Sequence, residues 1–88
     1  MDTLSFQDFN KLPIIEKIDR LERYGTYMEL KRIIGKYEVA LFNYAGLYIE
    51  VYLHRKTDSI DSVEAILSEK QLYPYLNKVD ISGIYSLI

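Results

Sequence analysis

Few side chains in this sequence could take part in chemistry, and they are spread along the chain. His54 is the single histidine, and there is no cysteine. One histidine is too few for a multi-histidine metal site, and a general base needs an orienting partner and a nearby nucleophile. Glu38, Glu50 and Tyr52 are expected near His54, but such crowding is common on a sheet surface. The sequence therefore indicates no catalytic residue.

The carboxylates and glycines also lack the spacing of a known site. The pairs Asp58 with Asp61 and Glu64 with Glu69 do not have the alternating oxygen ligands of a calcium loop. The four glycines are isolated, so the sequence contains no glycine-rich phosphate loop. We therefore expect no metal and no cofactor, and the sequence favours a protein that is not an enzyme.

The nine tyrosines are the most prominent chemical feature. Several of them are expected on the outer face of a sheet, and tyrosine is enriched at protein interfaces because it combines a large area with a polar tip. The C-terminal stretch is unusually apolar and could belong to the same surface or cover it. A third interpretation is that these tyrosines are ordinary surface residues. The interface candidates are Tyr27, Phe42, Tyr48, Tyr52, Ile84 and Leu87.

Length and charge limit the class of protein. With 88 residues, the chain is expected to form a single domain over residues 1–88. The net charge is −2, and the short basic pairs at 31–32 and 55–56 are not a patch, so no nucleic-acid partner is expected. The first five residues lack the pattern of a secretory signal, and no apolar run approaches the ~20 residues of a membrane helix. We expect a soluble, cytoplasmic protein.

Two helical segments are predicted at the start of the chain. Residues 5–12 could form a short turn capped by Ser5, with Phe6, Phe9 and Leu12 on one side. Residues 13–24 predict a firmer helix that ends at Gly25 in the left-handed conformation. The residues of this second helix that are expected to face the core are Ile14, Ile18 and Leu21, with Ile15 beside them.

Residues 26–34 and 37–43 predict a first hairpin. A two-residue loop that begins with Gly35 is typical of a type II′ turn. This turn pairs Leu30 with Leu41 and Met28 with Asn43.

Residues 43–46 predict a second turn, of type I with a glycine bulge. That turn pairs Leu41 with Ile49 and Val39 with Val51, so both hairpins place the same residues inside. Arg32 is the exception on this face, and its stem is expected to reach toward an edge. The predicted core face carries Met28, Leu30, Ile34, Val39, Leu41, Leu47, Ile49, Val51 and Leu53.

The last third of the chain leaves one ambiguity. Residues 60–67 have helical spacing, but the short loop before them favours a fourth antiparallel strand with a bulge. Residues 69–79 predict a short helix that begins near Pro74, with Leu72, Tyr75, Leu76 and Val79 inward. The predicted fold class is α+β, with an N-terminal helix packed on a three- to four-stranded antiparallel meander sheet and a short C-terminal helix.

Four short motifs resemble those of a set of small uncharacterised bacterial α+β proteins, over roughly residues 9–81. The resemblance implies a fold and no activity. The motifs are a Gly-Thr-aromatic step at 25–27, a Tyr-x-Val-x-Leu strand at 37–41, an aromatic-x-Glu-Val-Tyr strand at 48–52 and a Pro-Tyr-Leu helix at 74–76.

These patterns favour a non-enzymatic protein-interaction module that forms a homodimer. The exposed aromatic face and the apolar tail form too large an apolar surface for a small monomer. One alternative is a small-ligand or enzymatic pocket between helix and sheet. Another is an RNA-binding or RNA-cleaving protein of the size of small α+β toxins, against which the acidic balance argues.

Overall fold

The computed structural model describes residues 5–76, which form an α+β fold around one antiparallel sheet. The four strands lie in the order β1-β2-β3-β4, so the sheet is a simple meander. The strand prediction for residues 60–67 is confirmed, with an irregularity in the pairing next to Leu53. The elements are α1 (Phe6–Lys11), α2 (Ile14–Tyr24), β1 (Thr26–Ile34), β2 (Tyr37–Tyr44), β3 (Leu47–His54), β4 (Ile60–Ala65), the 3-10 helix η1 (Glu69–Leu72) and α3 (Tyr73–Leu76).

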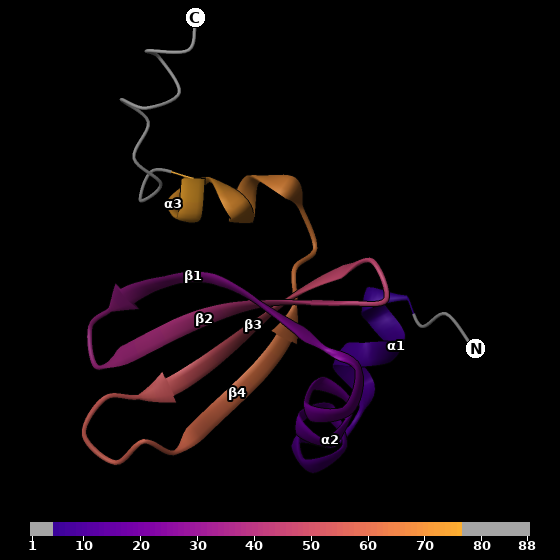
Figure 1. Ribbon diagram of the computed structural model, residues 1–88, viewed down its shortest axis with the longest axis horizontal. Coiled ribbons are helices and arrows are strands. Elements are labelled where there is room, and N and C mark those ends of the chain that lie inside the picture. Colours follow the sequence, from indigo (N-terminus) through magenta and orange to yellow (C-terminus); the bar gives the residue numbers. More distant parts are fainter. Residues whose placement is uncertain (1–4, 77–88) are drawn as a thin grey trace, which may run out of the picture.

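Helices cover both faces of this sheet. Figure 1 shows α1 and α2 on one side of the strands, and η1 with α3 on the other. The core is accordingly divided into two clusters, one between the sheet and the N-terminal helices and one between the sheet and the C-terminal helices. We call the side covered by α1 and α2 the α2 face, and the side covered by η1 and α3 the cap face. The prediction of a single core face is therefore wrong.

The N-terminal helices largely follow the sequence pattern. Ser5 accepts a hydrogen bond from the amide of Asp8 at 3.1 Å, which confirms the predicted cap, and Phe9 is fully buried. The inward side of α2 differs, because Lys17 is buried while Ile15 is 77% exposed. The Lys17 ammonium lies 6.0 Å from the Phe9 ring centre and 3.5 Å from Glu64. A long stem with a paired charge thus fills the space that the periodicity assigned to isoleucine.

Gly25 ends α2 for a different reason from the one predicted. Its φ of −79° is not left-handed. A Cβ atom at this position would lie 2.6 Å from the carbonyl oxygen of Leu21. Glycine is therefore required by the close approach of the chain to the helix end.

The first hairpin keeps the predicted register over most of its length. Gly35 has a φ of +55°, as a type II′ turn needs, and Leu30 pairs with Leu41. The register then shifts between Tyr27 and Leu30, where Glu29 adopts a φ of +59°. Because of this bulge Thr26 opposes Asn43, and the predicted pairing of Met28 with Asn43 is wrong.

The second hairpin is displaced by one residue from its predicted register. Ala45 and Gly46 both have positive φ, +50° and +83°, which is the signature of a two-residue type I′ turn. Leu41 therefore opposes Glu50, and not Ile49 as predicted. A shift of one residue moves every side chain of β3 to the other face. Ile49 and Val51 lie on the α2 face, whereas Glu50 and Tyr52 lie on the cap face.

The C-terminal helices form a small cap. Ser68 and Gln71 make a capping box at the start of η1. Leu72 and Tyr75 pack on Val39 and Leu41, and Tyr75 is only 1% exposed. The inward predictions for Leu72 and Tyr75 are thus confirmed, while the side chain of Leu76 and the whole of Val79 lie outside what the structure describes. Within residues 5–76, no helix has the length and apolar character needed to cross a membrane.

Candidate functional site

The predicted aromatic cluster is divided between the two faces of the sheet. Tyr27 and Phe42 lie on the α2 face with their ring centres 5.3 Å apart. Tyr52 packs on the cap face against Tyr37, at 5.8 Å. Tyr48 lies four residues before Tyr52 in β3, so it is on the same cap face, and it is 37% exposed. The other two interface candidates, at positions 84 and 87, lie outside the described residues.

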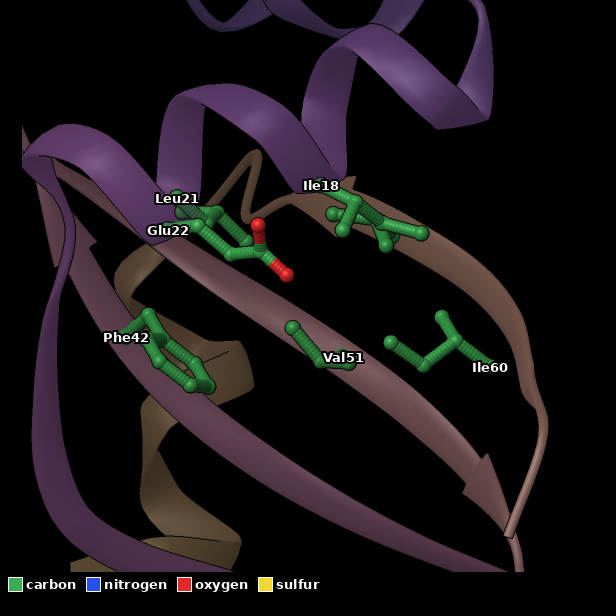
Figure 2. A pocket seen from close by; sticks show the side chains of 7 residues that line it. Ile18, Leu21, Glu22, Phe42, Val51 and Ile60 are labelled. Carbon is green, nitrogen blue, oxygen red and sulfur yellow. The ribbon is translucent and has the colours of Figure 1, made fainter.

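An apolar groove lies between α2 and the sheet. Figure 2 shows Ile18 and Glu22 of α2 facing Phe42, Val51 and Ile60 across an opening. The cavity volume is about 230 Å³, and Glu22 is the single charged residue that lines it. The complete lining, which we call the groove, is Ile18, Leu21, Glu22, Phe42, Val51, Ile60 and Val63.

The groove exists because α1 and α2 cover only part of this face. In Figure 1 both helices lie near the end of the sheet that holds the β2–β3 turn, away from the β1–β2 turn. Towards the uncovered end, Ile33 is 47% exposed, and Leu53 is half-buried. Lys31 and Glu38 form an ion pair of 3.0 Å on the same side. We call these four residues the open face.

The cap face holds the most polar buried arrangement that the structure describes. Glu50 is 4% exposed, and its Oε2 accepts hydrogen bonds from the Tyr75 hydroxyl at 2.6 Å and the Arg32 guanidinium at 3.1 Å. The guanidinium also lies 5.2 Å from the centre of the Tyr75 ring. Among the described residues, the buried Nε of Arg32 has no hydrogen-bond partner. We call Arg32, Glu50 and Tyr75 the cap triad.

The electrostatics of the cap triad favour a structural role. Burial raises the pKa of Tyr75 well above its ordinary value, and the hydrogen bond to Glu50 raises it further. Burial likewise raises the pKa of Tyr52, with the nearby charge of Glu50 as a second cause. Both phenols therefore stay neutral at physiological pH, and a phenol that holds its proton so firmly is a poor acid. The Arg32 prediction is corrected, since its head group is paired under the cap.

The imidazole of His54 is hydrogen-bonded within its own loop. Its Nδ1 accepts a hydrogen bond from the amide of Lys56 at 3.3 Å, and its ring meets that of Tyr37 edge-on at 6.0 Å. Within the part of the chain that the structure describes, no group of three or more His, Cys, Asp or Glu side chains could hold a metal ion. His54 is thus a loop-stabilising residue in this geometry.

Of the groove residues, the sequence assigns Ile18, Leu21 and Val51 to the core and Phe42 to the outer aromatic face. A type I′ turn at Ala45 and Gly46 would have placed Phe42 and Val51 on one face, but alanine gives no sequence signal for the positive φ that this turn needs. Comparison with protein-family models, curated proteins and solved structures finds no match for this chain. The geometry alone carries the functional interpretation.

Proposed function

We propose that this chain is a non-enzymatic protein-interaction module that forms a homodimer through the α2 face. The observation that carries the proposal is the groove and its continuation onto the open face, where the sheet lacks a covering helix within residues 5–76. Contiguous exposed apolar surface of this kind marks interaction sites in soluble proteins. Tyr27 is 42% exposed and its ring packs at a tilt against that of Phe42, so it adds an aromatic anchor at the rim.

The charges of the open face favour a second copy as the partner. Lys31 and Glu38 lie side by side, one positive and one negative. A two-fold axis that passes between these two side chains would place the lysine of one protomer against the glutamate of the other. The patch is therefore self-complementary in both charge and hydrophobicity.

The test is molar mass by light scattering behind size exclusion over a wide concentration range. We expect a dimer for the native chain and a folded monomer for Ile33→Lys, because an exposed position tolerates lysine while an apolar interface does not. Tyr48→Lys is the matched control on the cap face, with a similar exposed fraction of 37%. A native chain that is monomeric at every concentration overturns the proposal. A dimer that is broken by Tyr48→Lys and not by Ile33→Lys would show that the interface lies on the cap face, which also contradicts the proposal.

A second candidate function is the binding of a small apolar ligand in the groove. It is favoured by the nearly all-apolar lining, although about 230 Å³ is below the ~300 Å³ at which ligand pockets commonly begin. A thermal-shift screen with small aromatic and aliphatic compounds tests it. A true groove ligand should raise the Tm of the native chain and lose its effect in Ile18→Trp, which fills the groove. An equal shift in both proteins rules the groove out as the site.

A further inference from the structure

Two loops that are distant in the sequence lie side by side at one end of the sheet. They are the β1–β2 turn and the β3–β4 loop, both on the left of Figure 1. The amide of Arg55 donates to the carbonyl of Lys36 at 2.9 Å, and the Arg55 guanidinium donates to the carbonyl of Gly35 at 3.2 Å. Arg55 therefore joins the two loops into one structural unit.

This unit gathers positive charge around a depression. The depression has a volume of about 570 Å³ and is lined by Gly35, Lys36, Arg55 and Lys56, with no carboxylate among these residues. We call Lys36, Arg55 and Lys56 the loop-tip cations. Arg55 and Lys56 are neighbours in the sequence, and the fold brings Lys36 to them.

The clustering is unusual for this chain because most of its other cations are already engaged. Within residues 5–76, ion pairs hold Lys17, Arg23, Lys31 and Arg32, and Arg20 bonds the hydroxyl of Tyr44. The structure shows no ion pair for the three loop-tip cations among the described residues, although the whole chain carries a net charge of −2. Like charges that are held together repel, and an anion relieves that repulsion.

The backbone around the loop-tip cations is held in place. The amide of Lys56 donates to His54 Nδ1 at 3.3 Å, and the amide of Asp58 donates to the carbonyl of His54 at 2.8 Å. The Lys36 ammonium lies 5.5 Å from the centre of the Tyr37 ring. The backbone that carries these cations is thus held by hydrogen bonds, so little backbone entropy is lost when a ligand is bound.

We propose that the loop-tip cations bind a phosphate-bearing ligand. Phosphate suits the cluster because it offers several strong acceptor oxygens and more than one negative charge to donors that approach from two loops. The ligand can be a free phosphorylated compound or the backbone of a single-stranded nucleic acid, since both present the same group. The proposal is independent of the dimer, because it rests on different residues.

The test is a titration of the ¹⁵N-labelled protein, followed by NMR amide shifts, with inorganic pyrophosphate and separately with a single-stranded RNA of about eight nucleotides. We expect saturable shifts confined to residues 35–37 and 54–58 with at least one probe. With two to three phosphate contacts, the affinity for RNA should fall about tenfold when salt rises from about 50 to about 200 mM. Saturation by pyrophosphate alone identifies a free phosphorylated ligand, and saturation by RNA alone identifies a nucleic-acid strand.

Two charge-matched double variants make the test specific. Lys36→Gln with Lys56→Gln removes two loop-tip cations and leaves Arg55 to hold the loops, and it should weaken binding at least about tenfold. Lys11→Gln with Lys70→Gln removes two exposed cations elsewhere and should leave the affinity unchanged within about twofold. Absence of saturable shifts with both probes overturns the proposal. Equal weakening by the two double variants also overturns it, since it shows attraction to net charge and no site.

Discussion

The two faces of the sheet differ in how they treat polar and apolar surface. The cap face buries a charged pair, Arg32 with Glu50, beneath Tyr75. The α2 face leaves part of an apolar groove open beside Phe42 and Ile60. Hydrophobic burial stabilises a fold, and burial of a charge costs free energy unless the charge is paired. The cap face is covered although burying its charged pair costs free energy, whereas the α2 face leaves apolar surface open although burying it would stabilise the fold. This difference is the reason that we place the proposed interface on the α2 face.

The largest change in stability is expected when the buried acid Glu50 is removed. Glu50→Ala leaves the guanidinium of Arg32 and the hydroxyl of Tyr75 without their acceptor under the cap. We expect the free energy of unfolding to fall by about 3–5 kcal/mol, measured by urea denaturation. Glu22→Ala is the matched control on the exposed rim of the groove and should change it by no more than about 0.5 kcal/mol. Equal effects of the two substitutions would show that the faces do not differ as described.

A smaller change isolates the contribution of the cap itself. Tyr75→Phe keeps the buried ring and removes only the hydroxyl that donates to Glu50 at 2.6 Å. We expect a loss of about 1–3 kcal/mol in the free energy of unfolding, because the acceptor is charged and buried. Tyr48→Phe, on the same face and 37% exposed, provides the control and should be nearly neutral. A neutral Tyr75→Phe would mean that the hydrogen bond does not hold the cap.

The same hydroxyl makes stability depend on alkaline pH. The pKa of Tyr75 is raised in the folded state, so the unfolded chain, whose tyrosines ionise near pH ~10, loses its phenolic protons first. The stabilisation from this raised pKa is complete below pH ~10 and is lost progressively above it. Tyr52 acts in the same direction. The urea midpoint should therefore fall above pH ~10, and the fall should be smaller in Tyr75→Phe. A fall of the same size in both proteins would assign it to other groups.

The sequence predicted local elements better than it predicted faces. Both helical segments and the first three strands follow from capping, periodicity and turn residues that act over a few neighbours, and the fourth strand follows from the short loop before it. The first hairpin kept its register as far as Leu30, because Gly35 dictates its turn. The second did not, since Ala45 adopts a positive φ that its residue type does not announce. That single backbone torsion reassigned every side chain of β3.

The same register shift made the predicted aromatic face wrong. With β3 displaced by one residue, the expected aromatic face separated into Phe42 on one side and Tyr52 on the other. The cap triad could not be foreseen, because Arg32, Glu50 and Tyr75 come from three distant segments. Hydrophobicity patterns assign charged residues to the surface, so they cannot predict a buried ion pair of this kind. The sequence could predict the tyrosines as a feature, but not which of them share a surface.

The smallest change in stability is expected when both charges under the cap are replaced together. This variant distinguishes the free-energy cost of burying the charges from the stability that the cap provides. Replacing both partners, Arg32→Met with Glu50→Leu, removes the ion pair and leaves apolar side chains under Tyr75. Such paired replacements are often neutral or stabilising by about 1–4 kcal/mol, because neither charge remains desolvated. The Tyr75 hydroxyl then lacks an acceptor, so Tyr75→Phe is added to complete the apolar core. We expect this triple variant to unfold at a urea midpoint no lower than that of the native chain. A triple variant as unstable as Glu50→Ala would show that the charged pair itself holds the cap, and the contrast between a costly closed face and an open binding face would have to be abandoned.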